Sequence, residues 1–367
     1  MIIGIDGRSL EKIEITGIGE YTKNLLRGLS FAGIKCNLYC TKTPPKSNIP
    51  RNINVKILKA KNKYHFEQVC LLRELSQNPP SLYHATGNSG IPLFYKGVSV
   101  LTVHDLIPIT KKGYFKNSDF PVFSKTTFTI NVKNAIQKAK KIVSISKTTK
   151  KNIIKTTHVR ENKIKVIYPG VSVPKKIDST IIKRFGLEKN GFILNNGGID
   201  KRKNLERLIR SLPLVREVYP NIKLVITGNN VSYEKILMGL AKKMGINKNI
   251  IFTGFVSREA LWALIKKSSF ICYPSEDEGF GLPIIEAIEA KKPIILSNIP
   301  VFIEIAGDFG LFINKASPQE MAKKIIELKR DKNLQKDLVK KSLSKKGFFS
   351  WEKAVQKTIM LYKHIIK

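Results

Sequence analysis

Residues 273–290 read YPSEDEGFGLPIIEAIEA, which predicts a strand end, a glycine turn and the start of a helix. Proline is favoured in the first turn of a helix, so Pro283 predicts a helix that begins near Leu282. The free N–H groups of that helix, with the flexible glycine backbone ahead of it, are suited to an anion. Glu278 precedes the glycines, and Glu286 lies one turn inside the helix. Backbone N–H groups for phosphate and two carboxylates for hydroxyls indicate a nucleotide-sugar site.

The spacing of the two glutamates in this stretch is specific. On Glu286 alone, an ordinary α/β turn with a solvated helix residue would be the better interpretation. Glu278 and Glu286 are separated by seven residues around the core GFGLP, and the segment reads PSEDEGFGLPIIEA. It resembles the E-x7-E motif of retaining glycosyltransferases of family four, which have the GT-B fold.

The distribution of apolar runs predicts an α/β protein, and 367 residues are enough for two domains. Strands that alternate with helices in both halves predict two parallel, doubly wound sheets. The turn at Pro169-Gly170 marks the break between them. We expect an acceptor-binding domain at 1–173, completed by a C-terminal helix at 351–367, and a nucleotide-sugar-binding domain at 174–350. The resemblance implies the GT-B architecture, in which two Rossmann-like domains face each other across a cleft and the last helix crosses back onto the first.

Local patterns in the first half predict a helix over 64–75, a loop over 106–118 and a long helix over 119–140. The region 106–141 places phenylalanines among lysines, which favours either core packing or contact with a membrane that carries the acceptor. These phenylalanines are Phe115, Phe120, Phe123 and Phe128.

The balance of charged residues is extreme, since 65 Lys and Arg against 28 Asp and Glu give a net charge of +37. Such a charge favours an anionic partner, although lysine enrichment across a whole genome would explain it equally well. The lysines are scattered, and no nucleic-acid-binding motif accompanies them, so we expect an anionic membrane surface rather than nucleic acid as partner. No apolar run approaches the ~20 residues that span a bilayer.

The position of the first strand and the spacing of the cysteines indicate the cellular compartment of the protein. The chain enters a strand at 2–6 without a leader, which makes a secretory signal an unfavourable interpretation. Cys36, Cys40, Cys70 and Cys272 lack metal-ligand spacing and favour free thiols in a reducing compartment. We expect a cytoplasmic protein, peripheral on the inner face of the cytoplasmic membrane.

Two motifs of the first half are candidate site elements. Gly17-Ile18-Gly19 opens a helix, and glycine lets backbone approach a phosphate or an acceptor, although a plain helix start is the alternative. TGIGEYT resembles the family's first loop, usually TGIGRYT, with Glu20 in place of the common arginine. His104 follows a buried strand, where its imidazole would donate to a sugar hydroxyl and stabilise developing charge. A lone histidine is more often structural, but the family has a histidine after this strand; His84 is the weaker candidate.

Three loops of the second half carry the remaining candidates. Residues 195–204 read NNGGIDKRKN and place Arg202 and Lys203 at a helix start, where two cations suit a diphosphate. A basic helix cap is the alternative. The segment resembles the family's G-G-x-x-x-RKN loop, whose arginine and lysine contact the donor diphosphate. Gly228 and Val256 belong to later turns that would line a nucleotide pocket.

The resemblance implies a role for each of these residues. Catalysis would rest on His104 and Glu278; the diphosphate would contact Arg202, Lys203, Gly17 and Gly19; the donor sugar would contact Glu278, Gly279, Phe280 and Gly281; and the nucleoside would contact Glu286, Gly228, Val256 and Leu282. We expect no metal, because D-x-D is absent and the cluster Glu276-Asp277-Glu278 lacks a partner set.

The implied reaction is transfer of a hexose from a nucleoside-diphosphate sugar to a hydroxyl of a glycan or lipid-linked acceptor, with retention at the anomeric carbon. Mannose from GDP-mannose is favoured and UDP-sugars are the alternative; no cofactor is expected. Lipopolysaccharide, O-antigen or another cell-surface polysaccharide would be the product. A sugar phosphorylase or epimerase of the same fold is the main rival, and a basic nucleic-acid-binding protein is a weaker one. The nucleotide, acceptor, linkage and oligomeric state stay open.

Overall fold

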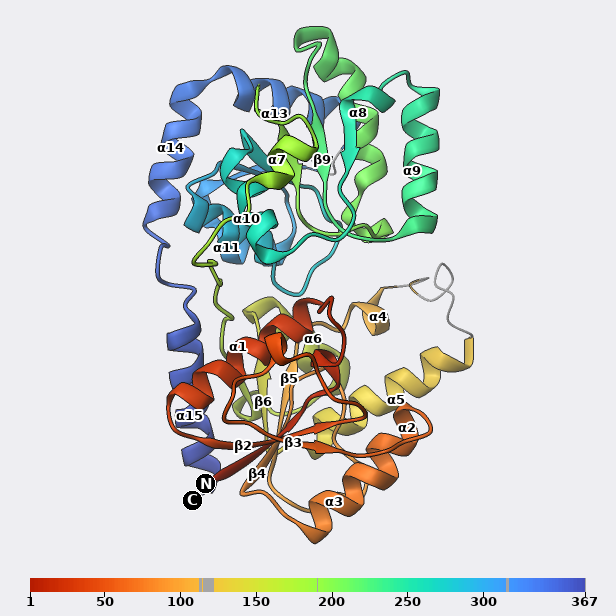
Figure 1. The fold of residues 1–367 in the computed structure, drawn as a ribbon, viewed down its shortest axis with the longest axis vertical. Coiled ribbons are helices and arrows are strands. Elements are labelled where there is room, and N and C mark those ends of the chain that lie inside the picture. The colour runs from red at the N-terminus through yellow and green to blue at the C-terminus, as the bar shows by residue number, and fades with distance from the viewer. Residues whose placement is uncertain (112–113, 115–121, 190, 315–316, 367) are drawn as a thin grey trace. The chain divides into compact units, whose positions relative to one another are not determined.

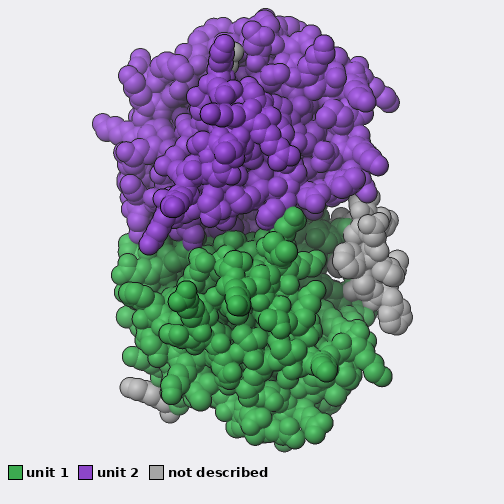
Figure 2. Space-filling model, viewed as in Figure 1, with its two compact units in different colours: residues 1–170, 349–367 green, residues 171–348 purple. Residues whose placement is uncertain are grey.

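The computed structural model describes residues 1–111, 114, 122–189, 191–314 and 317–366. They form two compact units (Figure 2). Unit 1 comprises residues 1–170 and 349–367, and unit 2 comprises residues 171–348. The sequence-based division at 173 and 351 lies close to these limits.

Unit 1 contains a parallel sheet of seven strands in the order β3-β2-β1-β4-β5-β6-β7. The strands are β1 (Ile2–Asp6), β2 (Lys35–Cys40), β3 (Asn54–Ile57), β4 (Leu82–Ala85), β5 (Ser99–Val103), β6 (Lys141–Ser144) and β7 (Ile164–Val166). Every residue of β4 and β5 is buried, as expected for strands covered on both faces. The strand order reverses between β1 and β4, and such a reversal opens a crevice beyond the carboxyl ends of the strands.

The helices of unit 1 cover its sheet (Figure 1). They are α1 (Gly17–Phe31), α2 (Lys63–His65), a π-helical segment (Phe66–Leu71), α3 (Leu72–Gln77), α4 (Ile107–Thr110), α5 (Val122–Lys138), α6 (Lys147–Thr157) and α15 (Trp351–Ile366). The predicted helix at 64–75 is present as α2, the π-helical segment and α3. The predicted loop at 106–118 is wrong at its start, because Asp105 accepts a bond from the N–H of Ile107 and Pro108 occupies the first turn of α4.

Unit 2 contains a second parallel sheet, of six strands in the order β10-β9-β8-β11-β12-β13. The strands are β8 (Ile193–Asn195), β9 (Leu224–Ile226), β10 (Ile250–Phe252), β11 (Phe270–Tyr273), β12 (Ile294–Ser297) and β13 (Gly310–Ile313). The helices are α7 (Thr180–Arg184), α8 (Leu205–Val218), α9 (Val231–Lys243), α10 (Arg258–Lys267), α11 (Leu282–Ala290), α12 (Pro300–Ala306), α13 (Pro318–Arg330) and α14 (Lys332–Leu343). The strand order of this sheet reverses between β8 and β11.

Two predictions about composition can be compared with this fold. Among the described residues, no helix combines the length and apolarity needed to cross a bilayer. Cys36, Cys40, Cys70 and Cys272 are free thiols, as predicted, and all except Cys70 are buried.

Candidate active site

The reversal of strand order in unit 2 brings two loops together that are far apart in sequence. The loop after β8 contains Arg202 and Lys203, and the loop after β11 contains Glu278. Because β8 and β11 are neighbours, both loops leave the same edge of the sheet. The N–H of Glu276 donates to the carbonyl of Arg202 at 2.8 Å, which joins the loops directly.

The Glu278 carboxylate is the centre of a buried polar cluster. It accepts hydrogen bonds from Arg202 Nη1 at 2.7 Å, Lys203 Nζ at 2.5 Å and the Tyr273 hydroxyl at 2.6 Å. Lys203 also lies 3.0 Å from the Tyr273 oxygen. A short 3₁₀ turn (Lys201–Lys203) presents the two cations, and Asp200 caps it by accepting from the N–H of Arg202 at 2.8 Å.

Burial and the neighbouring charges shift the pKa of each ionisable group in this cluster. Burial raises the pKa of Glu278, but Lys203 and Arg202 outweigh burial and hold the pKa of the carboxyl at about 2. Burial lowers the pKa of Arg202, and Glu278 more than compensates, so the pKa of the guanidinium is raised. Burial lowers the pKa of Lys203 by more than Glu278 raises it, so the pKa of this ammonium lies below its usual value. The site is therefore a preorganised pair of cations around one carboxylate, which suits the stabilisation of a phosphate leaving group.

The glycine turn after Glu278 begins helix α11 at Leu282, as the sequence predicted. Gly281 has φ +105°, and a Cβ there would lie 2.9 Å from Ile284 Cδ1. Any side chain at Gly281 would therefore be strained and crowded. Phe280 is buried, so the turn is fixed by its own packing. Gly279 lies in the same turn, between Glu278 and Phe280.

Glu286 is buried on α11, not solvated. Its carboxylate accepts from Arg258 Nη1 and from Asn196 Nδ2, each at 2.6 Å. Arg258 is the first residue of α10 and also donates to the carbonyl of Ser172. Asn196 and Arg258 were not predicted as partners of Glu286 from the sequence. A buried carboxylate predicts a cationic partner, but no sequence signal indicates which of 65 basic residues supplies it.

The turns after β8, β9 and β10 pack together. Gly228 has φ +122°, and a Cβ there would lie 2.8 Å from the Cα of Gly198. Its N–H donates to the carbonyl of Gly254 at 3.0 Å. Val256 follows two residues later and is half-buried. The nucleoside contacts expected of Gly228, Val256, Leu282 and Glu286 stay predictions.

His104 lies in unit 1 and is 8% exposed, directly after β5. Its Nε2 lies 2.8 Å from the carbonyl oxygen of Thr86, which can only accept, so the proton is on Nε2. Its backbone N–H donates to Asn88 Oδ1 at 2.7 Å. Burial lowers the pKa of the imidazole to about 4, partly opposed by Thr86. In the neutral tautomer that this bond favours, Nδ1 is an acceptor; the expected contact of His104 with a sugar hydroxyl stays a prediction.

The remaining candidates of unit 1 have structural roles. His84 bonds the Tyr362 hydroxyl at 2.5 Å and Thr102 Oγ1 at 2.8 Å, which ties α15 to the sheet. α1 begins at Gly17, and a Cβ at Gly19 would lie 2.7 Å from the carbonyl oxygen of Ser9. Gly19 is therefore required for close packing of the preceding loop. A shared diphosphate site for Gly17, Gly19 and the basic pair of unit 2 stays a prediction.

Two other predictions are only partly covered by the described residues. Phe115 and Phe120 lie outside them, nothing is described of the Phe123 side chain, and Phe128 packs against the core of unit 1. Within the described part of the chain, no group of three or more His, Cys, Asp or Glu residues could hold a metal ion. Metal independence stays a prediction.

Each of the two units matches the model of a known protein family. Residues 15–174 match the model described as Glycosyltransferase Family 4, and residues 178–345 match Glycosyl transferases group 1. The chain belongs to the glycosyltransferases that these two models describe. The two matches together extend over most of both units and confirm the resemblance drawn from the glycine and glutamate motifs.

Two curated relatives are O-antigen enzymes. The O-antigen chain mannosyltransferase RfbU of Salmonella typhimurium is 30% identical over 229 residues, which cover 62% of this chain and 60% of that protein. The O-antigen chain mannosyltransferase B of Escherichia coli is 25% identical over 271 residues, covering 72% and 70%. The match to RfbU thus spans less than two thirds of its length.

Solved structures have the same fold. WaaG, a glycosyltransferase involved in lipopolysaccharide biosynthesis, superposes with a TM-score of 0.78 at 13% identity over 99% of both chains. Anabaena HepE in complex with UDP-glucose superposes with a TM-score of 0.79 at 15% identity over 99% of both chains. The GT-B fold class predicted from the sequence is confirmed.

Proposed function

We propose that this chain is a retaining glycosyltransferase that moves a hexose from a nucleoside-diphosphate sugar to a hydroxyl of a glycan or lipid-linked acceptor. The observation that carries the proposal is the cluster of Arg202, Lys203 and Glu278 at the reversal point of the second sheet. Two cations held 2.7 and 2.5 Å from one buried carboxylate are oriented before any substrate arrives. Preorganised charge of this kind stabilises a departing diphosphate without further reorganisation.

In the proposed reaction, Arg202 and Lys203 neutralise the diphosphate as its bond to the anomeric carbon breaks. Glu278 is bonded to three donors and is held as an anion, so it orients those donors and the donor sugar rather than attacking the sugar carbon. A paired carboxylate for double displacement is thus not part of the proposed mechanism. The acceptor would attack on the side that the diphosphate leaves, and the leaving phosphate would take its proton. His104 would stabilise the bound sugar through a hydrogen bond between Nδ1 and a sugar hydroxyl.

The donor that we propose is GDP-mannose, with no separate cofactor. RfbU and mannosyltransferase B are both named as O-antigen mannosyltransferases, which supports mannose and a role in O-antigen or lipopolysaccharide synthesis. HepE was solved with UDP-glucose, which keeps UDP-sugars as the alternative.

We also propose that the chain acts at an anionic membrane surface on the cytoplasmic side. The net charge of +37 supports this, since each basic residue near such a surface contributes about 1 kcal/mol. Sedimentation with phosphatidylglycerol vesicles at low salt should carry the protein into the pellet, and 0.5 M NaCl should release it. Protein that stays in the supernatant at low salt would contradict this part of the proposal.

The donor is tested by a thermal-shift screen of GDP-, UDP- and ADP-sugars, with and without EDTA. A ligand that binds only the native state raises the melting temperature, and about 100-fold excess over Kd adds about 2.7 kcal/mol. Donor turnover is then measured in Glu278→Gln and Glu286→Gln, with Glu289→Gln on the same helix as control. We expect turnover to fall by at least a hundredfold in Glu278→Gln and to persist in the control. Full donor turnover in Glu278→Gln would contradict the proposed function.

A further inference from the structure

Helix α11 carries a buried carboxylate on a face that is otherwise apolar. The helix reads LPIIEAIEA, and the residues from Pro283 to Ile288 are all buried, with Glu286 4% exposed. A buried charge lowers stability unless partners compensate for its desolvation, and an apolar side chain at such a position often serves the fold as well or better. Contact with a ligand therefore explains Glu286 better than the packing of α11 does.

Two side chains from other segments of unit 2 hold this carboxylate. Arg258 Nη1 donates to Glu286 Oε1, and Asn196 Nδ2 donates to Glu286 Oε2, each at 2.6 Å. Arg258 begins α10, which lies beside α11 (Figure 1), and Asn196 directly follows β8. Asn196 offers a neutral amide, whereas Arg258 brings a full positive charge. Of these two partners, Arg258 therefore contributes more to keeping the Glu286 carboxylate ionised.

The second edge of the Arg258 guanidinium has a fixed anchor. Arg258 Nη2 donates to the Ser172 carbonyl at 2.8 Å, and the indole N–H of Trp262 donates to the same carbonyl at 3.2 Å. Trp262 lies one turn further along α10 and is 1% exposed, so this carbonyl is held against the helix. A planar guanidinium can span a carbonyl and a carboxylate with fixed geometry, which an ammonium on a flexible chain cannot do. Arg258 therefore sets the direction of the Glu286 carboxylate as well as its charge.

We propose that Arg258 is a positioning residue for the nucleoside of the donor. Arg258 keeps the Glu286 carboxylate ionised and aimed, so that this carboxylate accepts the hydroxyls of the ribose. The role rests on the proposed function, because it needs a nucleoside-diphosphate donor. It belongs to a residue outside the glycine and glutamate motifs, and Arg258 acts through Glu286 without touching the bonds that break.

Removal of the ribose hydroxyls measures what Arg258 does through Glu286. The probes are the nucleoside diphosphate of the donor found by thermal shift and its 2′,3′-dideoxy analogue, titrated into the full chain by calorimetry. We expect the unmodified chain to bind the ribose form at least tenfold more tightly, because hydrogen bonds to a charged group are strong. In Arg258→Met this preference should fall below threefold. A preference that stays at its original value in Arg258→Met, or equal binding of both probes by the unmodified chain, would overturn the inference.

Two further variants separate positioning from a general loss of structure. The double variant Arg258→Met with Glu286→Gln should have the same ribose preference as either single variant, because both residues act through one contact. Arg258→Lys keeps the charge but loses the two-point geometry, so it should recover part of the preference. Losses that add in the double variant, or a lysine variant no better than the methionine variant, would contradict a role through Glu286.

Steady-state kinetics give an independent measurement of the same role. Arg258→Met should raise the donor KM at least tenfold and change kcat less than threefold, because ribose contacts are the same in the ground state and the transition state. Lys266→Met removes an exposed positive charge near the end of the same helix and should change neither value. A fall in kcat with an unchanged donor KM would indicate loss of folded enzyme and would overturn the inference.

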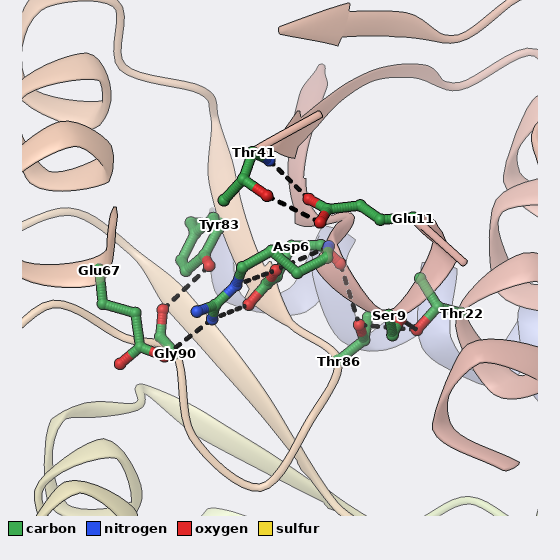
Figure 3. Close-up of polar contacts among 10 residues, drawn as sticks. Asp6, Ser9, Glu11, Thr22, Thr41, Glu67, Tyr83, Thr86 and Gly90 are labelled. Carbon is green, nitrogen blue, oxygen red and sulfur yellow. Dashed lines mark hydrogen bonds and ion pairs between the residues drawn. The ribbon is translucent and has the colours of Figure 1, made fainter. Parts of the chain in front are cut away.

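A partly buried arginine of unit 1 is the matched control for lost stability. Arg8 donates to Asp6 at 3.0 and 2.6 Å and to Glu67 at 2.8 Å (Figure 3). Arg8→Met should lower the melting temperature, as Arg258→Met does, because buried carboxylates lose their cation. It should leave the ribose preference unchanged, and an equal loss of preference in Arg8→Met would overturn the inference. Failure of the unmodified chain to bind any nucleoside-diphosphate sugar would instead refute the proposed function, so the two failures are distinguishable.

Discussion

Lys203 occupies an unusual position for a lysine, since its side chain is almost completely buried. Its ammonium contacts Glu278 and Tyr273, and its Nζ lies 5.1 Å from the centre of the Tyr273 ring. Burial of a charge is costly unless partners compensate, and a buried ion pair contributes little net stability compared with a well-packed apolar pair. The pair is therefore better explained by what it does to a phosphate than by stabilisation of the fold.

Lys203→Met separates these two explanations. Glu278 would keep Arg202 but lose its most buried partner, so we expect unit 2 to be destabilised by about 2 kcal/mol and donor turnover to be lost. Urea unfolding and the donor assay measure the two effects. Lys201→Ala, in the same turn but exposed, is the matched control and should change neither.

The double variant Lys203→Met with Glu278→Gln removes both buried charges. We expect it to recover most of the lost stability, because no unpaired charge remains, and to stay inactive. Recovery of activity together with stability would mean that the cluster is only structural.

His84 and His104 make the stability of unit 1 sensitive to acid. Burial lowers the pKa of His84 to about 3 and that of His104 to about 4. Both values lie below the ordinary pKa of about 6.5, so the unfolded chain binds protons first as the pH falls. The stabilisation is complete above pH 6.5 and is lost progressively as the pH falls toward 4 and then 3.

We therefore expect the free energy of unfolding of unit 1 to fall by about 1.4 kcal/mol per pH unit for each histidine below pH 6. His84→Gln should have a shallower dependence of melting temperature on pH, measured between pH 7 and pH 4.5. His364→Gln changes an exposed histidine on α15 and serves as the control. Identical slopes in all three proteins would show that His84 is not the source.

At the scale of elements, α15 is held on unit 1 by close packing and by a buried hydrogen bond. A Cβ at Gly28 on α1 would overlap the Val355 side chain on α15, so the helices approach closely at this glycine. The Tyr362 hydroxyl on α15 also forms a hydrogen bond with Nδ1 of His84 on β4. These contacts explain why the last helix belongs to unit 1 although it follows unit 2 in sequence.

Gly28→Ala should destabilise unit 1 by about 1–3 kcal/mol, because the added methyl overpacks this contact. The double variant Gly28→Ala with Val355→Ala should regain part of this stability, since space is returned. Gly239→Ala is the matched control: this glycine lies inside α9 with no atom within 4 Å of an added Cβ. It should gain about 0.5–1 kcal/mol instead. Urea unfolding measures each value, and a loss of equal size at both glycines would refute the packing argument.

At the scale of the whole molecule, a net charge of +37 opposes compaction. Salt screens repulsion between exposed lysines but hardly affects buried pairs such as Lys203–Glu278. We expect the melting temperature to rise by about 2–4 °C between 20 and 300 mM NaCl, which is about 1 kcal/mol for units of this size. A variant with four exposed lysines replaced by glutamine should show a smaller rise; these are Lys42, Lys175, Lys176 and Lys346. A melting temperature that falls with salt would contradict this.

The sequence alone determined both sheets, the start of α11 at Leu282 and the family, because strand and helix periods, glycine turns and the E-x7-E spacing are local patterns. Only the tertiary structure decided which side chains meet. The pairing of Glu278 with Lys203, of Glu286 with Arg258 and of Asp6 with Glu67 through Arg8 depends on strand order, which local patterns do not encode. It also placed the Thr86 carbonyl, which directly follows the neighbouring strand β4, within hydrogen-bond distance of His104 Nε2.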